Sequence, residues 1–143
     1  MLLFQIILHP TDFSATSQLA FQVACSVARD YKAQVLLLHV LSPPATVREM
    51  DEAFAAPDER FRKAMHDLQQ LKSDHSDIRF DYLLREGDPA QEILATANQR
   101  HCDLIVIGTH GKKGLQRVIV GSVAEDVLRR AYCPVLAVRA PAD

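Results

Sequence analysis

Short apolar runs along the chain alternate with longer segments in which apolar residues recur at helical spacing. The short runs have strand length, and the longer segments repeat an apolar residue every three or four positions. We therefore predict the order β-α-β-α-β-α-β-α-β, which is typical of a doubly wound parallel sheet with helices on both faces. The predicted strands cover residues 2–8, 35–40, 78–84, 104–107 and 134–138.

Local start signals place several helices. Ser14 suits an N-cap position, and Asp88 followed by Pro89 marks a helix start. Residues 45–57 are mixed in polarity and end in Pro57, so we expect an irregular connection there. The predicted buried stripes are Leu19, Ala20, Val23, Ala24, Val27, Ala28 and Tyr31, then Phe61, Ala64, Met65, Leu68 and Leu71, and then Ala90, Ile93, Leu94 and Ala97.

Four of the five glycines of the chain fall between residues 103 and 124. Ser122, with Glu125 three residues later, matches a capping box, so we expect a helix to begin at Ser122. A strand, a glycine-bearing loop and a helix N-terminus in this order favour phosphate binding, because the first amides of a helix lack partners within it. The four glycines are Gly108, Gly111, Gly114 and Gly121.

A second interpretation of this stretch stays open on the residues alone. The glycines would then serve only as turns, and Lys112, Lys113 and Arg117 would be solvated surface charges. Neither Gly-x-x-x-x-Gly-Lys-Ser/Thr nor Gly-x-Gly-x-x-Gly occurs in the chain, so the sequence favours neither a P-loop NTPase nor a dinucleotide-binding dehydrogenase.

Composition narrows the class of protein. The 143 residues are 48% apolar and 24% charged, which fits one domain over residues 1–143. A net charge of −2 gives no basic field for nucleic acid, and we expect neither a signal peptide nor a membrane span. The three cysteines are far apart and lie among apolar residues, so we expect buried thiols in a cytoplasmic protein.

Candidate catalytic chemistry is sparse. His9, His39 and His110 all follow predicted strands, but no zinc-ligand spacing is present, and His9 and His39 are expected on opposite sides of the sheet. The chain has no Gly-x-Ser-x-Gly nucleophile elbow. We therefore expect neither a metal site nor a nucleophilic enzyme.

The glycine spacing resembles that of a known family. Gly108-x-x-Gly111, nine residues and then Gly121-Ser122 is similar to the signature of the ATP-binding branch of the universal stress protein family. The resemblance also covers residues 10–14, His39-Val40 and the segment from Cys133 to Val138, and the chain departs from it at His9, where a small apolar residue is more usual. It implies strand order 3-2-1-4-5 in a single-copy member, and ATP with Mg²⁺ as the ligand.

The resemblance also assigns the binding roles. Asp12 and the main chain of Val40 would hold the adenine, while Ile107 and Gly108 would lie against the ribose and first phosphate. The residues themselves offer Asp12 a second role, as a turn residue that bonds its own backbone, and both roles are compatible. The implied site consists of Pro10, Thr11, Asp12, Val40, Ile107, Gly108, Thr109, His110, Gly111, Gly121, Ser122 and Val123.

Three functions remain at this point. The first is a stress-response regulatory protein whose partner interactions change with bound nucleotide. The second is a slow ATP hydrolase or nucleotidyl-transfer enzyme in the same crevice. The third is a dimeric interaction module without a physiological nucleotide. The short apolar strand from Pro134 to Val138 would lie at a sheet edge, so we expect a homodimer through that edge.

Overall fold

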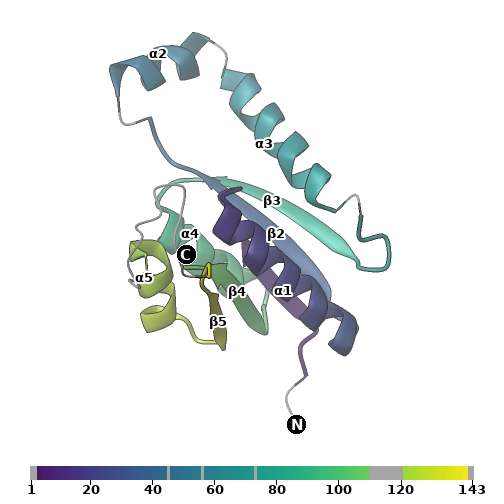
Figure 1. Cartoon of the computed structure of the whole chain (residues 1–143). Coiled ribbons are helices and arrows are strands. Elements are labelled where there is room, and N and C mark those ends of the chain that lie inside the picture. Colours follow the sequence, from purple (N-terminus) through teal and green to yellow (C-terminus); the bar gives the residue numbers. More distant parts are fainter. Residues whose placement is uncertain (1–2, 45, 56, 73, 110–120, 142–143) are drawn as a thin grey trace.

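The five strands form one parallel sheet. The computed structural model describes residues 3–44, 46–55, 57–72, 74–109 and 121–141. In it the strand order is β3-β2-β1-β4-β5, as predicted (Figure 1). The strands are β1 (Ile6–Pro10), β2 (Gln34–Leu41), β3 (Phe80–Glu86), β4 (Leu104–Gly108) and β5 (Val135–Val138).

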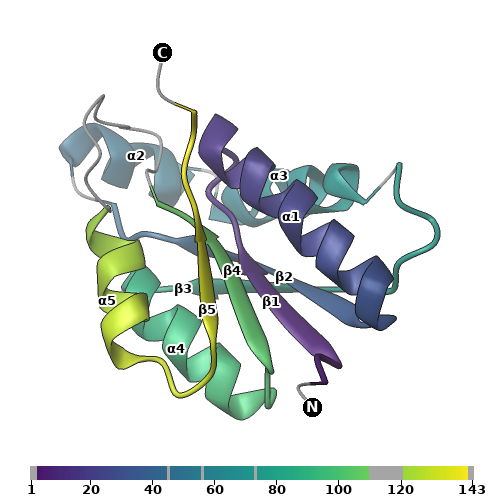
Figure 2. The same ribbon diagram turned by 60° about the horizontal axis from the view of Figure 1, so that its bottom comes forward.

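Helices cover both faces of this sheet, which confirms the predicted doubly wound architecture (Figure 2). On one face α1 (Ala15–Tyr31) and α3 (Pro57–Leu71) enclose a core that includes Ile7, Leu37 and Val106. On the other, α4 (Pro89–Gln99) and α5 (Ser122–Arg130) enclose Leu8, Leu36 and Ile105. Successive strand residues thus alternate between two buried faces, which is why the central strands β1, β2 and β4 are largely apolar.

The ladders around β1 differ in length. β1 pairs with β2 from Ile6↔Gln34 to Pro10↔Leu38, but with β4 only at Ile7↔Leu104 and Leu8↔Ile105. The strand order reverses between β1 and β4, and in such sheets ligands bind outside the carboxyl ends of the strands at the reversal. The fold therefore favours a ligand site at this edge of the sheet, between β1 and β4.

The start of α1 is as predicted, but its buried face is not. The Ser14 side chain accepts from the Ser17 amide at 3.2 Å and caps the helix. Leu19 and Tyr31, assigned to the buried stripe, are exposed, whereas Phe21 and Cys25 are buried. Apolar residues surround most of α1, so the contacts with the sheet decide which of them is buried, and the spacing alone does not. The complete buried set is Thr16, Ser17, Ala20, Phe21, Ala24, Cys25 and Ala28.

The segment expected to be irregular contains a helix, α2 (Val47–Ala55). Thr46 and Glu49 begin it with a capping box, in which the Glu49 amide donates to Thr46 Oγ1 at 3.0 Å and the Thr46 amide donates to Glu49 Oε2 at 3.2 Å. Figure 1 shows α2 beyond the end of β2 and next to α3. Its apolar residues stay largely in solvent, since Val47 is 74% exposed and Phe54 is 83% exposed.

Of the N-caps predicted for α4 and α5, the first is confirmed and the second is not. Asp88 accepts from the Gln91 amide at 3.0 Å with Pro89 in the first turn of α4, as predicted. Helix α5 does begin at Ser122, but its N-cap is Gly121, and no side chain of the described residues caps it. The prediction that Ser122 and Glu125 form a capping box is therefore wrong, because the N-cap lies one residue earlier, at Gly121. Ser122 already lies inside the helix, so its hydroxyl is exposed instead of bonded to the first turn.

Candidate functional site

The turn from β1 to α1 is held by its own side chains. Thr11 Oγ1 accepts from the Phe13 amide at 3.0 Å, and Asp12 Oδ1 accepts from the Ser14 amide at 2.9 Å. Between these bonds Phe13 has a φ of 65°, a left-handed conformation that non-glycine residues rarely adopt. The turn therefore stores some backbone strain, which recurs at binding and catalytic sites.

Asp12 has the structural role that its position in the turn suggests. Besides the Ser14 amide, its Oδ1 accepts from the Ser17 hydroxyl at 2.7 Å. The Asp12 amide in turn donates to Ser17 Oγ at 3.3 Å. These bonds fix the carboxylate just beyond the carboxyl end of β1.

The main chain of Val40 faces the side of β2 that β1 has left. The β1–β2 ladder ends where the Thr11 amide donates to the Leu38 carbonyl at 2.8 Å. Val40 follows Leu38 by two residues, so its amide and carbonyl point to the same side of β2. Among the described residues β1 provides no ladder partner for the main chain of Val40.

The end of β4 packs directly on the first turn of α1. Gly108 lies so close to Thr16 that a Cβ would come within 3.1 Å of Thr16 Cγ2. Part of the glycine pattern therefore serves helix packing. Ile107, the residue before it, is buried in the opposite core under α4 and α5.

Thr109 joins the end of β4 to the start of α5. Its amide donates to the Val138 carbonyl at 2.9 Å, and its carbonyl accepts from the Gly121 amide. The Thr109 side chain is only 2% exposed, and its hydroxyl has no hydrogen-bond partner among the described residues. The chain thus returns at Gly121 to the point where it left β4, with a buried hydroxyl beside the junction.

The first turn of α5 begins beside the same junction, and no side chain of the described residues caps it. Ser122 is exposed, and Val123 packs against the core beneath α4 and α5. The α5 N-terminus carries the partial positive charge that favours an anion. Two residues of the predicted site, His110 and Gly111, lie outside the described residues. All the others lie at the ends of β1, β2 and β4 or at the start of α5.

The two described histidines near this edge lie on the same face of the sheet, so their predicted opposite placement is wrong. His9 is fully buried against Phe21, with ring centroids 5.8 Å apart. The ring centroids of His39 and Phe13 lie 4.7 Å apart, and His39 Nδ1 lies 2.7 Å from the Thr11 carbonyl oxygen. Burial lowers the pKa of His9 to about 4, so its ring is neutral at pH 7. The described residues contain no group of three or more side chains suited to a metal ion.

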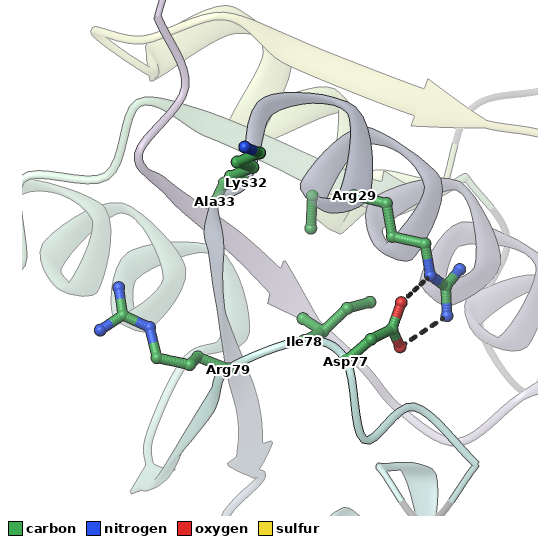
Figure 3. Close-up of a pocket in the computed structure, with 7 residues that line it drawn as sticks. Arg29, Lys32, Ala33, Asp77, Ile78 and Arg79 are labelled. Carbon is green, nitrogen blue, oxygen red and sulfur yellow. Dashed lines mark hydrogen bonds and ion pairs between the residues drawn. The ribbon is translucent and has the colours of Figure 1, made fainter.

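A pocket of about 280 Å³ lies at the opposite, amino end of the sheet (Figure 3). Its floor is formed by Ala28, Ala33 and Ile78, and its rim includes Arg29 paired with Asp77 at 2.7 Å. Arg29 lies in the last turn of α1 and Lys32 is its C-cap. The partial negative charge of a helix C-terminus favours such cations. None of the described residues of the predicted nucleotide site lines this pocket.

Comparisons with known proteins identify the family of the chain. The profile of the universal stress protein family matches residues 3–139. The chain belongs to the universal stress protein family. Universal stress protein MJ0531 of Methanocaldococcus jannaschii is 34% identical over 143 residues, which cover 97% of this chain and 84% of the relative.

Solved structures of universal stress proteins share the fold. The structure of MJ0577, also from Methanocaldococcus jannaschii, is 26% identical with a TM-score of 0.87, and the match covers 99% of each chain. A universal stress protein solved in complex with cAMP has a TM-score of 0.72 at 19% identity over 96% of this chain and 98% of that one. One from Archaeoglobus fulgidus, solved in complex with dAMP, has a TM-score of 0.61 at 23% identity over 96% and 99%. At these lower identities the likeness shows a shared fold.

Proposed function

We propose that this universal stress protein binds ATP with Mg²⁺ at the carboxyl edge of the sheet, between β1 and β4. The proposal depends on one observation above all. The Gly121 amide donates to the Thr109 carbonyl, and this brings the N-terminus of α5, which no described side chain caps, to the strand-order reversal. Relatives of the same fold that were solved with cAMP and dAMP support an adenine nucleotide as the ligand class.

The residues at this edge suit the parts of a nucleotide. Asp12 and the main chain of Val40 would hold the adenosine end, and the α5 N-terminus with Gly121 and Ser122 would meet the phosphates. Thr109 offers a buried hydroxyl that has no partner among the described residues. Mg²⁺ would neutralise phosphate charge, and we assign it no ligand among the described side chains.

We further propose that the bound nucleotide regulates the protein's contacts with other proteins in the cytoplasm. The described part of the site offers no side chain placed to activate water, since Asp12 Oδ1 is already bonded to Ser14 and Ser17. None of the described helices has the length and apolar character that a membrane crossing requires. The edge strand β5 provides a surface for a homodimer.

A thermal-shift titration tests the nucleotide site. At a hundredfold excess over Kd, ATP should stabilise the wild type by about 2.7 kcal/mol. Gly121→Val should fold normally, because Gly121 has φ −61° and ψ 155°, which any residue adopts. Its Cβ and branch would stand where phosphate approaches, so the ATP-dependent shift should disappear. An equal shift in both proteins would place the nucleotide elsewhere, and acid extraction of the purified protein would identify which adenine nucleotide it carries.

A steady-state assay separates binding from turnover. We expect ATP hydrolysis far below the roughly 10 s⁻¹ that is typical of enzymes. Turnover near that value, lost on Asp12→Asn, would identify the protein as an ATP hydrolase.

A further inference from the structure

The ladder between β1 and β4 stops for a reason that the sequence itself contains. In a parallel ladder every second residue of a strand donates and accepts toward the same neighbour. The pairing of Leu8 with Ile105 sets the register. In that register the carbonyl of Val106 would accept from the amide of residue 10. Residue 10 is proline, which has no N–H to donate.

The side chain of His9 supplies the missing donor. Its Nδ1 lies 2.9 Å from the Val106 carbonyl oxygen, a contact between residues 97 positions apart. A carbonyl can only accept, so Nδ1 carries the proton and Nε2 is the unprotonated nitrogen. Nε2 is buried and has no hydrogen-bond partner among the described residues, so the bond to Val106 is the one that fixes the ring.

The ring itself is held firmly in the core. His9 is fully buried and packs against Phe21 of α1. A donor fixed in this way replaces the ladder bond in the last position before β1 turns away. It ties the β1 end, with Thr11 and Asp12, to the β4 end, with Gly108 and Thr109.

We propose that His9 is a positioning residue for the nucleotide, because its bond to Val106 sets the spacing between the β1 and β4 ends of the site. This inference rests on the proposed function. His9 itself lies beneath the site in the core, so it acts through the two strand ends and makes no contact with the ligand. Removing the bond should loosen the pair of loops and weaken nucleotide binding in a protein that remains folded.

Two substitutions separate the bond from the bulk of the ring. His9→Phe keeps a ring of similar size but has no donor. His9→Asn places an amide N–H at the same distance from Cα as Nδ1, but leaves space where the ring was. By calorimetric titration with ATP and Mg²⁺, well below each melting temperature, His9→Phe should bind about tenfold more weakly than wild type. His9→Asn should bind within about threefold of wild type while melting at a lower temperature than His9→Phe.

Leu68→Ala provides a matched control. Leu68 is fully buried in the same core but on α3, away from the strand ends. Its loss should lower the melting temperature and leave the Kd for ATP unchanged. The wild-type titration comes first, because absence of binding there refutes the proposed function, and this inference with it, before any variant is compared.

Where wild type binds, two results overturn the inference. One is a Kd for His9→Phe within twofold of wild type, and the other is equal weakening in both His9 variants. Should His9→Phe fail to fold, nitrogen NMR of the wild type decides. A proton on Nδ1 that exchanges slowly, with a signal that shifts on adding ATP and Mg²⁺, supports the positioning role. A proton on Nε2, or a signal that ATP leaves unmoved, refutes it.

Discussion

Gly108 at the end of β4 and Thr16 in the first turn of α1 are in closer contact than most side chains at position 108 would allow without a shift of the neighbouring atoms. A Cβ there would lie 3.1 Å from Thr16 Cγ2 and 3.2 Å from both the carbonyl carbon and the carbonyl oxygen of Thr16. Two of these three atoms are main chain and have little freedom to move. The glycine therefore brings the start of α1 down onto the sheet at the same edge as the proposed site.

Gly108→Ala should accordingly destabilise the protein by overpacking, by about 1–3 kcal/mol, as measured in urea unfolding. Thr16→Ser removes only Cγ2, so the double variant should recover a part of this loss and not all of it. Full recovery would show that the methyl group alone limits the approach. No loss in Gly108→Ala would contradict the close packing.

The buried His9 makes stability depend on pH. Burial lowers its pKa in the folded protein from 6.5 to about 4. Between these values the unfolded chain binds a proton that the folded protein does not, so stability is present above pH 6.5 and is lost as the pH falls toward 4. The loss should reach about 3 kcal/mol. The free energy of unfolding of His9→Phe, measured over the same range, should lack this component, and parallel curves would refute the assignment.

The three thiols should react slowly in the native protein. Burial raises the pKa of Cys25 and of Cys102 to about 11, and it also raises the pKa of Cys133. Since the thiolate is the reactive form, Cys25 and Cys102 should react with a disulfide reagent at pH 8 about a hundredfold more slowly than a free thiol. In urea all three should react at the rate of model thiols. Rapid modification of Cys25 or Cys102 in the folded protein would contradict this.

The proposed dimer can be tested at the exposed edge of the sheet. Leu136 on β5 is 40% exposed, whereas Val135 packs against the core under α4 and α5, so a charge at Val135 would test folding instead. Wild type should scatter light with twice the 16.0 kDa mass of the chain. Leu136→Lys should reduce this to the monomer mass. Leu19→Lys is the matched control, because Leu19 is 39% exposed on α1 and should leave the dimer intact.

Parts of this fold could be predicted from the sequence because the deciding chemistry is local or topological. Ser14 and Asp88 bond to amides three residues away, so their caps are readable from spacing. The alternation of strands and helices, with right-handed crossovers, leaves few strand orders. The capping box of α2 was equally readable at Thr46 and Glu49. The prolines on either side and the mixed polarity of the segment suggested an irregular connection instead.

Other features depend on contacts between distant parts of the chain. The buried face of α1 is set by the sheet beneath it, and the helix has apolar residues on nearly every side. The bond from His9 to Val106 joins residues 97 positions apart, so no local spacing reveals it. Of the predicted site, the turn after β1, the end of β4 and the start of α5 lie close together at one edge of the sheet. Gly108 and Asp12 also have packing and turn roles, and the motif alone did not separate these roles from binding.

Helix α2 should unfold locally, independently of the sheet. It has nine residues, and in isolation a helix of that length is marginal in water. Because Val47 and Phe54 are exposed, α2 buries little apolar surface and gains little stability from packing against the rest of the protein. Its amides should therefore exchange with deuterium through local fraying, while those of β1 and β2 exchange only when the whole protein unfolds. Residues 47–55 thus form a separate, weaker cooperative unit, which a protease could cut without first unfolding the sheet.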